Sequence, residues 1–158
     1  MTSQANPKLD LEITRVINAQ RSVVWRCWVE GELLKQWFCP KPWRVSRADL
    51  DVRAGGASII VMNGPNGEEM PNPGQYVEVV EGKRLVFTDA FSGDWRPAGK
   101  PFMVGYVELS DAPGGKTNMV WGARHWTEDD MKQHLSMGFE AGWNAAADQL
   151  DELAKSLK

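Results

Sequence analysis

The sequence predicts an α+β domain in which a curved antiparallel sheet of about six to seven strands wraps around a long C-terminal helix, with two short helices after the first strand. Short segments of alternating apolar and polar residues, separated by turn residues, indicate the strands. A 3.6-residue apolar period over 127–158 indicates the helix. Because one helix must cover a whole sheet face, the sheet has to curl, which leaves space for a pocket at its wide end.

The chain is expected to form a single domain over residues 8–158, preceded by a disordered polar tail over residues 1–7. A length of 158 residues is enough to bury a substantial core without stapling by disulfides or metals. Neither an internal repeat nor a linker divides the sequence.

A change in the spacing of apolar residues separates a first strand from two short helices. Alternation from Leu9 to Ile17 predicts a half-buried strand. A short helix then begins after Ser22 and ends at Gly31, and a second one covers 32–38 before Pro40 stops it.

Strands dominate the middle of the chain. Clusters of turn residues, such as Asn63 to Gly67, separate the alternating segments and indicate antiparallel hairpins. Six further strands are predicted, at 45–52, 57–62, 76–80, 84–91, 102–109 and 117–125.

The C-terminal helix is predicted as one unbroken element that begins after Thr127. Thr127 is a good N-cap, and Asp130 completes the capping box. Gly138 and Gly142 lie on the apolar face, where each costs about 1 kcal/mol relative to alanine. Either the opposing layer approaches closely there, or the missing side chains leave room for a ligand beside Trp143.

Composition excludes several classes of partner. A net charge of −3 and a pI near 5.4 provide no positive surface for nucleic acid or anionic membranes. With neither a signal-like N-terminus nor a membrane-spanning run, a cytoplasmic location is expected. Cys27 and Cys39 do not form a CxxC pair and are expected to remain free thiols.

The sequence carries no recognisable catalytic, metal-binding or cofactor motif. His125 and His134 are the only histidines, and the acidic residues of 128–130 are better explained by the helix dipole than by a metal site. We therefore expect no metal and no cofactor and assign no catalytic residue, although a histidine near the helix start is chemically able to act in acid–base catalysis.

Charged residues on the strands allow two interpretations. Alternation places Glu78 on the face of Tyr76 and Asp89 on the face of Phe87. These carboxylates either face solvent, or face the cavity and pair with Arg124 to orient a polar group of a ligand.

Several motifs occur in a characteristic order: Leu11-Glu12-Ile13-Thr14-Arg15, Val24-Trp25, Trp37-Phe38-Cys39-Pro40, Gly55-Gly56, Asn66-Gly67-Glu68, Leu85-Val86-Phe87-Thr88 and Gly138-Phe139-Glu140-Ala141-Gly142-Trp143. In this order they resemble the Aha-type family, which is named for the activator of the heat-shock-protein-90 ATPase and belongs to the START-like, or SRPBCC, superfamily. The resemblance covers about residues 8–157 and implies a helix-grip fold with a cavity between sheet and helix.

Three functions are consistent with these observations. The first is non-enzymatic binding of a small hydrophobic or aromatic molecule by a monomer or homodimer; the second, implied by the family name, is interaction with a chaperone. The third is a cyclase or dehydratase that uses the same cavity. The expected ligand-binding residues are Trp37, Glu78, Phe87, Asp89, Phe91, Trp95, Trp121, Arg124, Phe139, Gly142 and Trp143.

Overall fold

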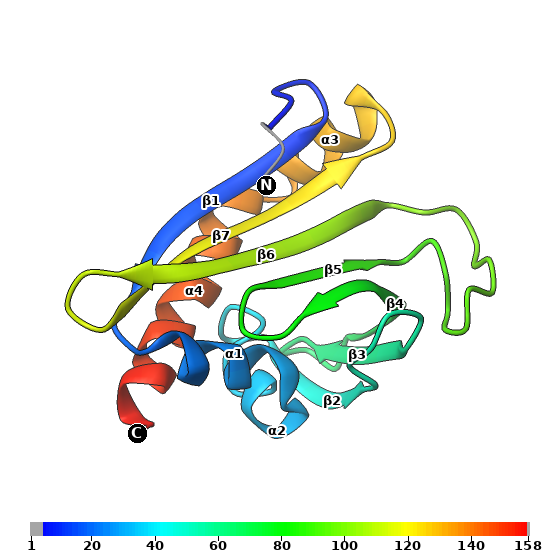
Figure 1. The fold of residues 1–158 in the computed structure, drawn as a ribbon. Helices are drawn as coiled ribbons and strands as arrows, with labels where there is room; N and C mark the ends of the chain where they lie inside the picture. Colours follow the sequence, from blue (N-terminus) through cyan, green and yellow to red (C-terminus); the bar gives the residue numbers. More distant parts are fainter. Residues whose placement is uncertain (1–4, 158) are drawn as a thin grey trace.

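The computed structural model describes residues 5–157, so most of the predicted tail over 1–7 lies outside the described residues. Within this range seven strands form one antiparallel sheet in the order β1-β7-β6-β5-β4-β3-β2 (Figure 1). The strands are β1 Asp10–Ile17, β2 Arg44–Leu50, β3 Ala57–Asn63, β4 Glu69–Val80, β5 Arg84–Thr88, β6 Met103–Ala112 and β7 Lys116–His125. The predicted meander is confirmed, and β1 joins it by pairing with β7.

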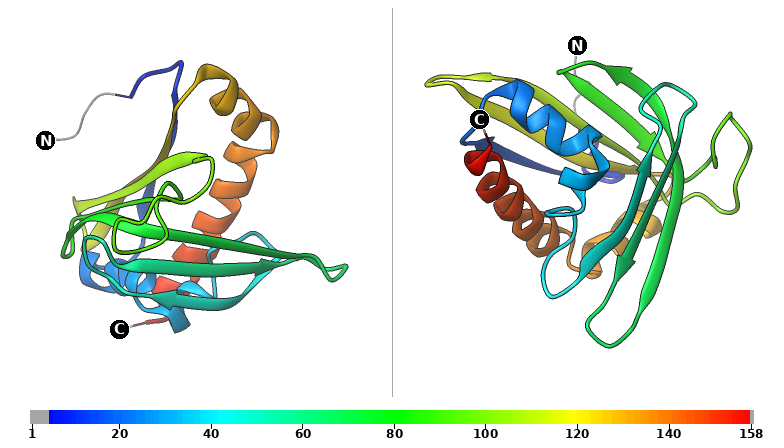
Figure 2. Two further views of the ribbon diagram at one scale, coloured as in Figure 1. Left: turned by 90° about the vertical axis from the view of Figure 1, so that its right-hand side faces the viewer. Right: turned by 90° about the horizontal axis from the view of Figure 1, so that it is seen from below.

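The helices lie inside the curve of the sheet. They are α1 Arg21–Val29, α2 Gly31–Leu34, α3 Glu128–Ser136 and α4 Phe139–Ser156. The sheet bends around α1 and α4, and α4 packs against β1 and α1 (Figure 2). The predicted fold class is therefore confirmed, with α4 as the long C-terminal helix.

The prediction of one unbroken helix from residue 127 was wrong. The helix breaks at Gly138, whose φ of 89° is left-handed, and α4 restarts with the Gly142 N–H donating to the Gly138 carbonyl at 2.8 Å. Glycine adopts this conformation without the strain that a Cβ causes. The apolar period continues across the break, so periodicity alone did not reveal it.

Strand β4 begins at Glu69, seven residues earlier than predicted. The added part contains Pro71 and Pro73, which cannot donate ladder hydrogen bonds. In the structure β5 pairs only with residues 75–80, so both prolines lie where β4 has a single neighbour, β3. An unpaired edge tolerates the missing N–H groups.

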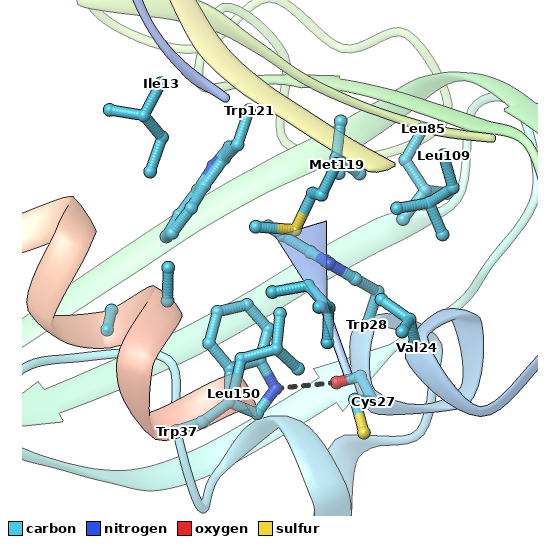
Figure 3. Close-up of a cluster of buried hydrophobic side chains, with 14 of the residues drawn as sticks. Ile13, Val24, Cys27, Trp28, Trp37, Leu85, Leu109, Met119, Trp121 and Leu150 are labelled. Carbon is cyan, nitrogen blue, oxygen red and sulfur yellow. Dashed lines mark hydrogen bonds between the residues drawn. The ribbon is translucent and has the colours of Figure 1, made fainter. Parts of the chain in front are cut away.

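The core is rich in tryptophan (Figure 3). The rings of Trp28 and Trp37 meet edge to face with centroids 4.7 Å apart, and Trp28 meets Trp121 in the same way at 5.1 Å. The indole N–H of Trp37 donates to the Cys27 carbonyl at 2.9 Å. Cys27 and Cys39 are free and buried, as predicted, and burial raises the pKa of each thiol to about 11.

The predicted N-cap is confirmed, because the Asp130 N–H donates to the Thr127 hydroxyl oxygen at 3.1 Å. We expect Thr127→Ala to lower the free energy of unfolding by about 1 kcal/mol, since the N–H loses its acceptor. Thr127→Ser keeps the oxygen and is the control. Urea denaturation of the three proteins tests this, and equal midpoints for alanine and serine would show that the cap does not stabilise the fold.

Candidate functional site

A cavity of about 620 Å³ lies between the inner face of the sheet and the junction of α3 and α4. Strands β3 and β4 provide one wall, the ends of β5 and β6 the next, and the helices and the segment 38–40 the rest. Most of the lining is apolar or aromatic, which is typical of sites for small organic ligands. The lining includes Phe38, Pro40, Ile60, Met62, Met70, Phe87, Phe102, Met103, Trp121, His134, Met137, Phe139, Gly142 and Trp143.

Six of the predicted ligand-binding residues line this cavity: Phe87, Asp89, Trp121, Phe139, Gly142 and Trp143. Three of them form a continuous aromatic wall. The ring of Trp143 stacks on Trp121 with centroids 4.3 Å apart and lies 4.3 Å from that of Phe139. This wall joins β7 to α4 across the inner side of the sheet.

Three predicted aromatic residues lie elsewhere. Trp37 is 1% exposed and belongs to the core behind Trp121. Phe91 and Trp95 pack on each other, with centroids 5.5 Å apart, in the loop between β5 and β6 that projects from the sheet (Figure 1). None of the three is part of the cavity lining.

Glu78 and Arg124 are not part of the cavity lining, so of the two interpretations the inward pairing with Arg124 does not apply to Glu78. Glu78 pairs with Arg84 at 3.1 Å, while Arg124 lies over the ring of Tyr106. A register shift between Tyr76 and Glu78 interrupts the alternation of β4, which is why Glu78 does not share the buried face of Tyr76.

Asp89 is the predicted carboxylate that does line the cavity. Its oxygens accept the Phe102 N–H at 2.9 and 3.0 Å and the Met103 N–H at 3.3 Å. These bonds fix the start of β6 against the end of β5, so the carboxylate already has backbone partners.

Gly142 borders open space rather than a tightly packed layer. A Cβ at this position would meet only the Cγ of Pro40, at 4.0 Å. The sequence allowed either a close approach of the opposing layer or room for a ligand, and Gly142 fits the second explanation. Gly138 is explained instead by its left-handed φ.

We expect Gly142→Ala to leave the free energy of unfolding unchanged or to raise it by up to about 1 kcal/mol, because alanine favours the helix and its methyl group has space. Gly31→Ala is the contrasting variant, since its Cβ would lie 2.3 Å from the Ala48 carbonyl oxygen. Thermal denaturation of both tests the contrast. Strong destabilisation by Gly142→Ala would mean that the helix has no spare room.

The two histidines form a buried pair at the side of the cavity. His125 Nδ1 lies 2.7 Å from the Leu9 carbonyl oxygen, and His125 Nε2 lies 2.9 Å from His134 Nδ1. A carbonyl only accepts, so His125 carries its proton on Nδ1 and its Nε2 accepts from His134 Nδ1–H. Burial and then the neighbouring His125 lower the pKa of His134 to about 4, so this ring is neutral at pH 7.

The sequence indicated a histidine near the start of the C-terminal helix, but the expected ligand-binding residues included neither His134 nor the methionines of the rim. Met62 and Met70 face each other across β3 and β4, and Met137, 65% exposed, lies at the helix break. Alternation with Ile60 was an available signal for Met62, whereas the exposure of Met137 depends on the break at Gly138.

The curved sheet, the C-terminal helix and the cavity between them define a helix-grip, START-like protein. The family profile of the Activator of Hsp90 ATPase homolog 1-like proteins matches residues 18–155. The chain belongs to this family.

Solved structures agree with this assignment. A crystal structure of a protein from Nitrosomonas europaea is 39% identical, with a TM-score of 0.93 and coverage of 96% of this chain and 97% of the other. An NMR structure from Arthrobacter aurescens has the same fold at 22% identity, with a TM-score of 0.82 and coverage of 98% and 90%. An AHSA1-like protein from Aeromonas hydrophila is similar at 17% identity, with a TM-score of 0.66 and coverage of 92% and 93%. A search of curated proteins produced no match.

No helix within residues 5–157 has the length and apolar character needed to cross a membrane. No group of three or more histidine, cysteine or acidic side chains in this range is arranged to hold a metal ion.

Proposed function

We propose that this protein binds a small hydrophobic or aromatic molecule in the cavity between the sheet and the α3–α4 junction. The observation that carries the proposal is the cavity of about 620 Å³ with its wall of Trp121, Trp143 and Phe139. Aromatic walls with few polar groups favour ligands with large apolar surfaces. The family's START-like fold supports binding as a function without identifying the ligand.

The rim supports the same proposal. Met70 and Met137 are 47% and 65% exposed, although both line the cavity. Methionine side chains are flexible and adapt to ligands of different shape. A methionine-rich opening is therefore suited to admitting an apolar molecule.

Binding of the neutral fluorescent probe N-phenyl-1-naphthylamine tests the proposal. We expect saturable binding by the wild-type protein and loss of at least tenfold in affinity for Gly142→Met, whose side chain would occupy the cavity. Ala141→Met is the matched control, because Ala141 is exposed and is not part of the cavity lining. Absence of saturable binding, or equal affinity in both variants, would contradict the proposal.

A chaperone partner is the second candidate, and the family description is the observation that favours it. A pull-down with the bacterial Hsp90-type chaperone tests it, and stimulation of the chaperone's ATPase would replace ligand binding as the principal function. A cytoplasmic location, in keeping with two unpaired buried cysteines, remains part of the proposal.

A further inference from the structure

The His134 ring belongs to the aromatic surroundings of the cavity. Its centroid lies 5.0 Å from that of Phe102, 5.1 Å from that of Phe139 and 5.7 Å from that of Trp143. All four residues line the cavity. A polar ring at this position therefore meets a ligand among apolar neighbours, where a hydrogen bond is strengthened by the low local dielectric.

The hydrogen-bond chain to Leu9 determines which nitrogen of His134 remains available. His125 Nδ1–H donates to the Leu9 carbonyl, and His134 Nδ1–H donates to His125 Nε2. In the neutral ring the other nitrogen, Nε2, is then an unprotonated acceptor. Within residues 5–157 this atom has no hydrogen-bond partner, and it is not among the fully enclosed polar atoms.

Among the other polar side chains of the lining, Gln75 Nε2 and Trp121 Nε1 are buried without a partner in the described part of the chain, but both atoms are donors, whereas several other groups already have partners. Asp89 accepts from the backbone N–H groups of Phe102 and Met103, and the Asn72 amide donates to the Met70 carbonyl at 3.0 Å. The hydroxyl of Ser58 is hydrogen-bonded to Tyr76. His134 Nε2 is thus an acceptor that a ligand can engage without breaking an existing bond.

We propose that His134 Nε2 accepts a hydrogen bond from the ligand, so that the cavity selects an aromatic molecule bearing a hydroxyl group over the same molecule without a donor. His125 and the Leu9 carbonyl act as positioning groups, because they hold the proton of His134 on Nδ1. This proposal rests on the proposed function and specifies the class of its ligand.

Paired probes test the proposal. We expect 2-naphthol to bind about tenfold more tightly than 2-methoxynaphthalene, which has the same ring system but no donor. In His134→Phe this preference should disappear. In His134→Gln, whose amide oxygen is an acceptor, part of the preference should return.

Each outcome separates the two proposals. If neither probe binds the wild-type protein, the proposed function fails. If both bind equally, or if the preference survives in His134→Phe, the role of His134 is contradicted while binding stands. As a measurement that needs no variant, ¹⁵N NMR of the wild-type protein at pH 7 should identify the Nδ1–H form of His134, and the Nε2–H form would overturn the proposal.

Discussion

Trp121→Ala is expected to lower the free energy of unfolding by about 3–5 kcal/mol, the typical cost of truncating a buried tryptophan. Trp121 is 2% exposed, and its ring meets Trp28 at 5.1 Å, Trp37 at 5.7 Å and Trp143 at 4.3 Å between centroids. Alanine would remove the side chain that joins the core tryptophans to the cavity wall. Because α4 packs against β1, it cannot move far into the cavity that the missing indole ring leaves. Much of this cavity should therefore persist in the variant.

Guanidinium denaturation measures this effect, and Trp126→Ala is the matched control. Trp126 is 50% exposed, so its loss should change the free energy of unfolding by less than about 1 kcal/mol. Similar destabilisation by the two substitutions would mean that the tryptophan cluster is not the centre of the core.

Acidification from pH 7 to pH 4 is expected to destabilise the wild-type protein by roughly 2–3 kcal/mol more than His134→Gln. Burial and His125 lower the pKa of His134 to about 4 from an ordinary value of 6.5. Between these values the unfolded chain binds a proton that the folded protein does not, so stability falls as pH falls. Above pH 6.5 the contribution is fully present, and each pKa unit corresponds to about 1.4 kcal/mol.

Free energies of unfolding at intervals from pH 4 to pH 8 measure the effect. Carboxylates contribute equally to both proteins, so the difference between the two curves isolates the histidine. A constant difference across the range would show that His134 titrates alike in the folded and unfolded chains.

The sequence by itself determined the elements whose signals are local. Strand alternation and turn residues predicted the meander, and the side chain of Thr127 predicted the start of α3, because a cap depends on neighbours three residues away. Phe87 and Trp121 were among the expected ligand-binding residues, and both line the cavity. These local patterns, with the need to cover one sheet face, were sufficient for the fold class.

Tertiary structure decided the features that depend on residues far apart or on a single backbone angle. The left-handed φ of Gly138 divides a continuous apolar period, and one register shift in β4 turns Glu78 outward. Neither the helix break nor the register shift interrupts the pattern of apolar and polar residues, so that pattern does not predict them.

The position of each aromatic residue relative to the cavity was also a tertiary property. Trp37 and Trp121 are equally apolar, yet one is enclosed by the core and the other forms the cavity wall. The partner of His134 is His125 of β7, which is itself hydrogen-bonded to the Leu9 carbonyl, so the tautomer of His134 depends on the closed sheet. Local sequence specifies the helix or strand on which a side chain lies, but only the packing of distant segments determines which residues that side chain contacts.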